Sequence, residues 1–232
     1  MNHPDLLISR TGATLSVTLN RPDKLNAIHN DMALGLLQVI DAAAGDDNVR
    51  VLLLRGAGRA FCAGRDVSAP PTEDDLVLVQ GVAQALVSCP KPVVAAVHGW
   101  TLGAGLEWML DCDVVIAANT TRFRLPEASL GVFVTGGLSA TLAASVGLMR
   151  AKSLMLLGDE FSAAQAQAWG LVAEVVEPDA LEAAAWRTCE RLASLAPAVA
   201  GQFKKVLNEV GLGAFAQAIT LENAAQRSLG AG

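Results

Sequence analysis

Hydrophobic and polar residues alternate along the first part of the chain with the two-residue period of β-strands. Residues 15–20 follow this pattern and predict a strand that pairs with residues 6–10 across a turn at Thr11 and Gly12. Compact apolar runs, which are typical of strands buried on both faces, follow further along the chain. They predict three more strands, at residues 49–55, 93–97 and 114–118.

Between these strands the apolar residues recur with the spacing of an amphipathic helix. Asn30 is a good N-cap residue, and the apolar positions of the helix that it predicts are Met32, Leu36, Val39, Ile40 and Ala43. Thr72 can cap a second helix, whose inward positions are Val79, Val82, Ala83 and Leu86. Strands that alternate with helices predict an α/β fold with parallel strands and right-handed crossovers.

From Ser162 onward the pattern is mostly helical, with one predicted strand at residues 172–176. Three apolar helix faces follow: Leu181, Ala184, Ala185, Leu192 and Leu195; then Phe203, Val206, Leu207 and Val210; then Leu212, Phe215 and Ile219. We therefore expect a core domain over residues 1–195 and a C-terminal helical segment over residues 196–232. Apolar helices beyond a core commonly pack against other subunits, so the second segment is predicted to mediate oligomerisation.

Composition and charge narrow the class of protein. The chain has 232 residues, of which 52% are hydrophobic and 17% charged, so it can bury a large core and is not disordered. Its net charge of −6 argues against general binding to nucleic acid or to an anionic membrane. The N-terminus has no signal-peptide pattern, and four polar residues interrupt the apolar region 93–118, so we expect a cytoplasmic protein without a spanning helix.

Four cysteines complete this picture, at positions 62, 89, 112 and 189. They form no CxxC pair and have no metal-ligand spacing with the three histidines, which favours a reduced protein with no metal site. Cys62 alone lies in a glycine-containing loop, residues 58–66, where a reactive thiol would be conceivable. Packing is still the better interpretation of this residue, because small buried cysteines are usually inert.

The segment with most chemical content contains a Gly-rich turn, Gly103-Ala104-Gly105, between an apolar strand and a predicted helix. Such a turn leaves backbone N–H groups free at a helix N-terminus, where they can stabilise a developing oxyanion. Glu107 lies in the first turn of that helix, and Glu127 follows Pro126 after the next strand. Two carboxyl groups at one pocket can supply a proton acceptor and a proton donor.

Three ordered motifs give the chain a resemblance to the enoyl-CoA hydratase/isomerase (crotonase) superfamily. Residues 98–114 match its HGxxxGAG segment and the Cys-Asp-Val that follows, residues 58–66 resemble its AFxAGxD loop, and residues 20–27 resemble its NRPxxxNA entry segment. The resemblance extends from about Ile8 to Leu229. It implies a crotonase-like spiral of ββα turns, in which two stacked sheets are ringed by helices and followed by a C-terminal helical segment.

The family also implies roles for individual residues. The backbone N–H groups at Arg65 and Ala104 would form the oxyanion hole, and one such donor is typically worth about 3–4 kcal/mol of barrier. Glu107 would accept a proton from a water that attacks Cβ of a 2-enoyl thioester, and Glu127 would donate one to Cα. A single glutamate on a helix is usually a surface residue without a catalytic role. The pair Glu107 and Glu127 has the family's spacing, which favours the catalytic interpretation.

Coenzyme A would be part of the substrate, and no further cofactor is expected. The positions that match the family's CoA-binding residues are Lys24, Ala27, Ala63, Arg65, Asp66 and Val67. The family assembles as trimers or pairs of trimers, so a homotrimer or hexamer is expected, with an acyl-CoA as the small-molecule partner and no nucleic-acid or membrane partner.

The leading hypothesis is therefore an enoyl-CoA hydratase, a lyase of the kind used in fatty acid metabolism. The alternatives are an enoyl-CoA isomerase, which can work with one glutamate, a thioester or C–C hydrolase on the same scaffold, and a non-enzymatic relative that binds CoA or RNA. Two departures bear on the reaction. Thr135 stands where many hydratases have a glycine, and Trp100 or Trp108 could line an acyl pocket, although packing is the commoner role.

Overall fold

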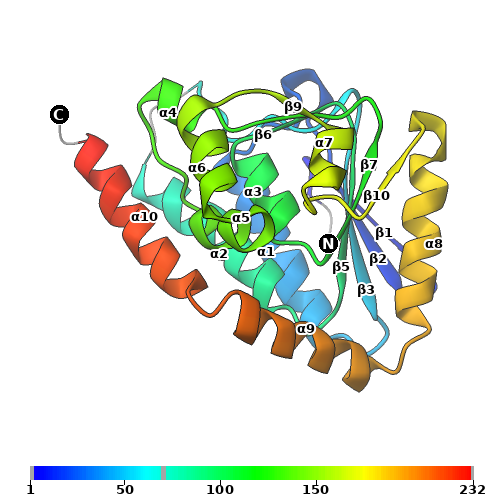
Figure 1. Cartoon of the computed structure of the whole chain (residues 1–232). Helices are drawn as coiled ribbons and strands as arrows, with labels where there is room; N and C mark the ends of the chain where they lie inside the picture. The colour runs from blue at the N-terminus through cyan, green and yellow to red at the C-terminus, as the bar shows by residue number, and fades with distance from the viewer. Residues whose placement is uncertain (1–2, 69–71, 231–232) are drawn as a thin grey trace.

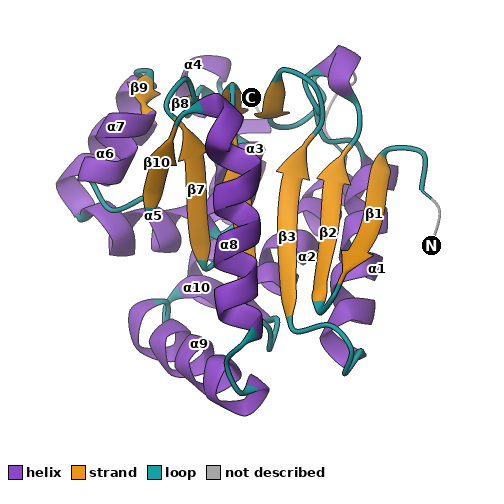
Figure 2. Ribbon diagram, turned by 90° about the vertical axis from the view of Figure 1, so that its right-hand side faces the viewer, coloured by secondary structure: helices purple, strands orange, loops and turns teal. Residues whose placement is uncertain are grey.

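A computed structural model describes residues 3–68 and 72–230, and its largest element is a six-stranded sheet (Figures 1 and 2). The strand order is β1-β2-β3-β5-β7-β10. β1 and β2 are antiparallel, and every other neighbouring pair is parallel. The strands are β1 (Leu6–Thr11), β2 (Thr14–Leu19), β3 (Val51–Gly56), β5 (Val93–Val97), β7 (Val114–Ala118) and β10 (Glu174–Val176).

A second, four-stranded sheet has the order β4-β6-β8-β9. Its strands are β4 (Ala60–Cys62), β6 (Trp100–Leu102), β8 (Arg122–Arg124) and β9 (Phe161–Ser162). β4, β6 and β8 each follow a strand of the large sheet after a short turn, so the chain runs through repeated ββα units. This arrangement confirms the crotonase-like spiral that the motifs implied.

Helices cover both faces of the large sheet (Figure 2). α1 (Asn30–Gly45), α2 (Glu73–Ser88) and α3 (Ala104–Leu110) lie on one face, and α8 (Leu181–Ala193) crosses the other. β3 shows the two-residue period of this packing, since Val51 and Leu53 join the cluster with α8 whereas Leu52 and Leu54 join the cluster with α1 and α2. Both faces of the strand are therefore buried, as its unbroken apolar run predicted.

The N-terminal cap predictions had different outcomes. Thr72 caps α2 in a capping box, in which its side chain accepts from the Asp75 N–H and the Asp75 carboxylate accepts from the Thr72 N–H. Asn30, by contrast, is the first residue of α1, and the capping position is His29, which forms no side-chain cap bond. The prediction that Asn30 caps this helix was wrong by one residue, although all five predicted inward positions of α1 are buried.

The C-terminal half is mainly helical, as expected. Its remaining helices are α4 (Glu127–Leu130), α5 (Leu138–Val146), α6 (Leu148–Leu157), α7 (Ala163–Ala168), α9 (Pro197–Gly211) and α10 (Phe215–Gly230), with 3-10 turns η1 (Pro22–Lys24) and η2 (Pro178–Ala180). α9 and α10 run along one side of the molecule (Figure 1). In the part of the chain that the structure describes, no helix is long and apolar enough to cross a bilayer.

α9 and α10 differ in what covers their apolar residues. Phe215 and Ile219 of α10 are buried against this chain's own core. On α9, Phe203 is 68% exposed, Leu207 66% and Val210 83%. The apolar face of α9 is therefore open in the single chain, whereas α10 is part of the core.

Candidate active site

Two loops meet where β4 and β6 end. The first continues from β4 through Ala63 and Gly64 to Arg65, and the second passes through Gly103 into α3. A Cβ at Gly64, whose φ is +86°, would lie 2.9 Å from the Leu102 carbonyl oxygen and 3.5 Å from the Ala104 nitrogen. Only a glycine allows this approach, so the Gly-rich motifs bring the two loops together.

The backbone N–H groups of Arg65 and Ala104 are free at this junction. Ala104 is the first residue of α3, so its N–H has no partner within the helix. Neither N–H donates a hydrogen bond to another residue of the described chain, and both residues line the same cavity of about 540 Å³. The two donors are therefore available to a ligand oxygen.

Glu107 and Glu127 also line this cavity, although they come from different helices. Glu107 lies on α3 and is 2% exposed, while Glu127 begins α4 after Pro126. A Cβ at Gly103, one helical turn before Glu107, would lie 2.5 Å from the Glu127 Oε1 atom. The glycine thus lets the second carboxyl group reach the helix that bears the first.

Burial raises the pKa of both carboxyl groups. Desolvation, followed by the nearby charges of Glu127 and Glu222, places the pKa of Glu107 well above its usual value, although the N–H groups of Gly136 and Thr135 oppose this. Desolvation raises the pKa of Glu127 to about 7. Both carboxyl groups therefore keep their protons to higher pH than exposed glutamates do, which suits proton exchange with a substrate near neutral pH.

The segment from Phe133 to Ser139, here called the 133–139 loop, contacts the first glutamate. The Gly136 N–H donates a hydrogen bond to Glu107 Oε2, and a Cβ at Gly136 would lie 3.4 Å from the Glu107 Cδ atom. Thr135 lines the cavity beside this contact. The substitution of threonine for glycine at position 135 therefore leaves the close contact to Glu107 intact, because Gly136 makes it.

Apolar side chains form most of the remaining cavity wall: Val67, Leu76, Val79, Leu130, Val132 and Phe133. Among the polar groups, Arg65 Nη2 pairs with Asp75 Oδ2 at 3.0 Å, and Gln226 reaches the cavity from α10. The sequence did not identify Leu76, Leu130, Phe133 or Gln226 as site residues. For Gln226 no local signal exists, because it lies 99 positions after Glu127 and reaches the site only through the packing of α10.

The structure divides the predicted CoA-binding residues into two groups. Ala63, Arg65 and Val67 line the cavity. Lys24, Ala27 and Asp66 lie outside its lining, with Lys24 exposed in η1. Asp66 accepts hydrogen bonds from Ser68 and pairs with Arg21 at 3.1 Å, and these contacts lower the pKa of Asp66 to about 2. This ion pair joins the entry segment to the AFxAGxD loop.

Neither tryptophan of the Gly-rich segment lines the cavity. Trp108 is fully buried, and its Nε1 donates to the Val79 carbonyl at 3.2 Å, so its role is packing. Trp100 is 37% exposed at the start of β6. Cys62 is also buried beneath the loop, and desolvation raises the pKa of its thiol to about 12, so the thiol is protonated and unreactive at neutral pH.

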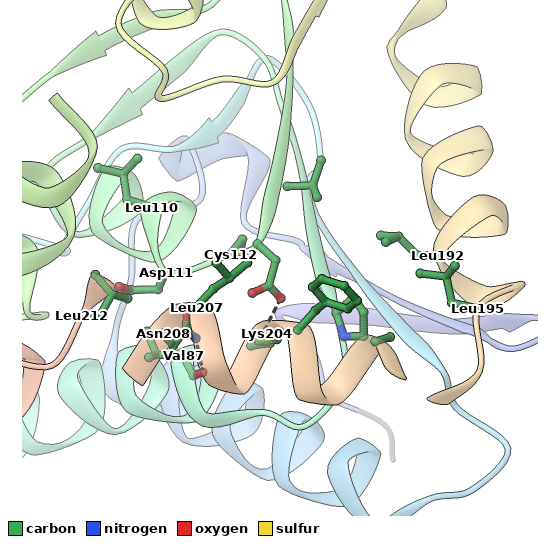
Figure 3. A pocket seen from close by; sticks show the side chains of 15 residues that line it. Val87, Leu110, Asp111, Cys112, Leu192, Leu195, Lys204, Leu207, Asn208 and Leu212 are labelled. Carbon is green, nitrogen blue, oxygen red and sulfur yellow. Dashed lines mark hydrogen bonds and ion pairs between the residues drawn. The ribbon is translucent and has the colours of Figure 1, made fainter. Parts of the chain in front are cut away.

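A separate hollow of about 330 Å³ lies between α9 and the segment from Leu110 to Val114 (Figure 3). Its wall is mostly apolar, and it contains neither Glu107 nor Glu127. At its base Lys204 Nζ pairs with Asp113 Oδ2 at 2.8 Å and donates to the Leu86 carbonyl at 2.8 Å. This ion pair, whose lysine is buried, attaches α9 to the core.

Comparison with known proteins gives consistent matches over the whole chain. A family model described as enoyl-CoA hydratase/isomerase matches residues 9–231. The chain is 34% identical to the 1,2-epoxyphenylacetyl-CoA isomerase of Escherichia coli K12, over 93% of this chain and 86% of that protein. It is also 34% identical to the 2,3-dehydroadipyl-CoA hydratase of the same organism, over 88% of this chain and 82% of that protein. A crystal structure of an enoyl-CoA hydratase from Mycobacterium avium subsp. paratuberculosis K-10 superimposes with a TM-score of 0.95 at 34% identity, covering 99% of this chain and 95% of that one.

Proposed function

Since the chain belongs to the enoyl-CoA hydratase/isomerase family and is an acyl-CoA enzyme of that family, we propose that it is an enoyl-CoA hydratase. One observation carries the proposal: Glu107 and Glu127 line a single cavity together with the free N–H groups of Arg65 and Ala104. Hydration needs two proton-transfer groups and an oxyanion site around one substrate, and these residues supply them.

In the proposed reaction the thioester oxygen lies between the N–H groups of Arg65 and Ala104. A water held by the two carboxyl groups attacks Cβ of a 2-enoyl-CoA as Glu107 takes one of its protons. Electron density moves through the double bond to the thioester oxygen, and Cα then receives the proton of Glu127. The proton on Glu107 then passes to Glu127 through the next water in the site, which restores the pair. The atoms of one water are added and no electrons are exchanged, so the reaction requires no cofactor beyond the CoA of the substrate.

The surroundings of the two carboxyl groups support this sequence. Glu127, with a pKa of about 7, can hold the proton that Cα receives. The Gly136 N–H at Glu107 Oε2 favours a negative charge on the other carboxylate, against the desolvation that raises its pKa. Glu107 is buried at this cavity, and the low polarity around it strengthens its interactions with charged and polar groups.

We also propose that the pantetheine arm of CoA runs along Ala63, Arg65 and Val67, which line the cavity. Lys24, Ala27 and Asp66 would then contact the more distant parts of CoA, and the Arg21–Asp66 ion pair would hold this surface in place. Removal of that pair by Asp66→Asn should raise KM more than it lowers kcat, because the affected contacts lie away from the reacting atoms.

For the quaternary structure we propose a homotrimer or a pair of trimers. The observation behind this proposal is the open apolar face of α9, with Phe203, Leu207 and Val210. An exposed apolar patch of this kind is typical of a subunit interface. Light scattering of the purified protein tests the proposal, and a monomer at micromolar concentration would contradict it.

The second candidate function is isomerisation of an enoyl-CoA double bond. The observation that favours it is the 34% identity to a relative named as an acyl-CoA isomerase. An isomerase moves a proton between carbons and can do so with one carboxyl group. Two carboxyl groups at the same cavity favour hydration, because one can activate water while the other protonates carbon.

Loss of enoyl absorbance with crotonyl-CoA tests the hydratase proposal. We expect Glu107→Gln and Glu127→Gln each to reduce turnover at least about a hundredfold, because proton transfer by a positioned group contributes roughly 10²–10⁴-fold. Glu190→Gln, on the exposed side of α8, is the matched control and should retain activity. Absence of hydration across a range of acyl lengths would reject the proposal, whereas conversion of a 3-enoyl-CoA that survives Glu127→Gln would favour the isomerase.

A further inference from the structure

Glu222 of α10 is a buried carboxyl group that the proposed reaction does not use. It is 1% exposed, and no basic side chain of the described chain forms an ion pair with it. Its partners are backbone groups instead: Oε2 accepts from the Gly137 N–H at 2.8 Å, and Oε1 accepts from the Ser139 N–H at 2.7 Å. Both carboxylate oxygens are therefore occupied by the 133–139 loop.

These bonds lie directly beside the loop's contact with the catalytic cavity. Gly136, the residue before Gly137, donates its N–H to Glu107 Oε2. Because the two glycines are adjacent, the orientation of the Gly136 N–H depends on where Glu222 holds the Gly137 N–H. Glycine at position 137 is required by its φ of +83°, and a Cβ there would lie 2.8 Å from Cδ2 of the Phe215 ring on α10.

The other end of the loop is held by the same helix. Gln226, one turn after Glu222, accepts the Phe133 N–H at 2.6 Å. α10 thus binds the loop at Phe133 and again at Gly137 and Ser139, and the free stretch between these points carries Thr135 and the Gly136 N–H. This geometry is more specific than helix packing requires, because a buried carboxylate without a cation costs stability that an apolar residue would not.

We propose that Glu222 is a positioning residue for the reaction: its carboxylate fixes the 133–139 loop so that the Gly136 N–H is aimed at Glu107. The inference rests on the proposed function of the Glu107–Glu127 site, but it applies to any turnover at that site. Glu222 itself contacts no substrate, and it acts through the loop on the orientation and charge of Glu107.

Glu222→Gln tests the proposal, because glutamine has the same shape but presents one acceptor oxygen and one NH2 group where the carboxylate presents two acceptors. One of the two loop N–H groups then faces a donor. We expect kcat to fall about tenfold or more with KM changed less than about threefold, since a displaced general base loses part of its roughly 10²–10⁴-fold effect. The acid limb of the kcat profile should also move to lower pH, because the Glu222 charge that raises the pKa of the base Glu107 is gone.

Asn223→Ala is the matched control. Asn223 is the next residue on α10 and hydrogen-bonds Gln80 of α2, so its removal loosens the docking of the helix without touching the loop. We expect this variant to keep kcat within about twofold of wild type. An equal loss of kcat in both variants, or wild-type kcat in Glu222→Gln, would overturn the proposal.

Hydrogen exchange of the wild-type protein gives a second test that needs no folded variant and no substrate. If Glu222 holds the loop, the amides of Gly137 and Ser139 should exchange as slowly as those of the core helices. Exchange at the rate of an exposed loop would overturn the proposal even if hydration is confirmed. Slow exchange without hydratase activity would instead reject the proposed reaction and retain the positioning of the loop.

Discussion

Glu127→Gln should stabilise the folded protein while it removes the proposed activity. Burial raises the pKa of Glu127 from 4.5 to about 7 in the folded state. Each pH unit between the folded and unfolded pKa values corresponds to about 1.4 kcal/mol, so this difference amounts to about 3 kcal/mol. Glutamine has nearly the same shape and does not titrate, so the variant escapes that cost.

The sign of the effect follows from where the proton is held. The folded protein keeps a proton on Glu127 that the unfolded chain releases between pH 4.5 and about 7. The free energy of unfolding of the wild type therefore falls as the pH rises through this window. The variant should differ little from wild type below about pH 4.5 and should be more stable by up to about 3 kcal/mol above about pH 8.

Urea unfolding, followed by fluorescence of the four tryptophans at several pH values, measures this difference. Glu190→Gln, on the exposed surface of α8, provides the comparison for a carboxyl group that is not buried. A stability difference between Glu127→Gln and wild type that stays constant with pH, or that shrinks as the pH rises, would refute the reasoning.

The remaining predictions concern the cavity and the core. The acid limb of kcat/KM should lie above the ordinary glutamate pKa, because desolvation raises the pKa of the base Glu107; a limb at the pH expected for an exposed glutamate would be inconsistent with a buried base. Gly136→Ala should reduce kcat, because a Cβ there would lie 3.4 Å from Glu107 Cδ and closer still to the Glu107 carboxylate. The control Gly45→Ala should not change kcat, because a Cβ at that position meets nothing within 4 Å. Equal activities of the two variants would argue against a role for the 133–139 loop. Lys204→Met leaves the Asp113 carboxylate, whose side chain is 21% exposed, without its cation and should lower the free energy of unfolding by about 1–3 kcal/mol in urea titrations. A change below about 1 kcal/mol would show that the pair contributes little.

The sequence predicted the elements that have strong periodicity. All six strands of the large sheet were placed within two residues of their observed ends, and α1 and α2 bury the predicted side chains, because clear apolar patterns leave few alternatives. The strands of the small sheet could not be found in this way. They are two or three residues long, too short to show a period, and the spiral that they form was implied by the family motifs alone.

At the candidate active site, the sequence motifs identified the residues that lie in or near the Gly-rich loops. Arg65, Ala104, Glu107 and Glu127 converge on one cavity as the resemblance implied. The contributions of α10 were not predicted, because Glu222 and Gln226 have no local signature and act through contacts more than 80 positions away. Their role depends on tertiary packing, which a single sequence does not specify.

The most direct measurement is turnover of crotonyl-CoA in water enriched in heavy oxygen, with the product identified by mass spectrometry. We predict a 3-hydroxyacyl-CoA that carries one heavy oxygen at Cβ, and its loss in both Glu107→Gln and Glu127→Gln. A product that has shifted its double bond without taking up oxygen, or labelling that persists in either variant, would contradict hydration by this carboxyl pair.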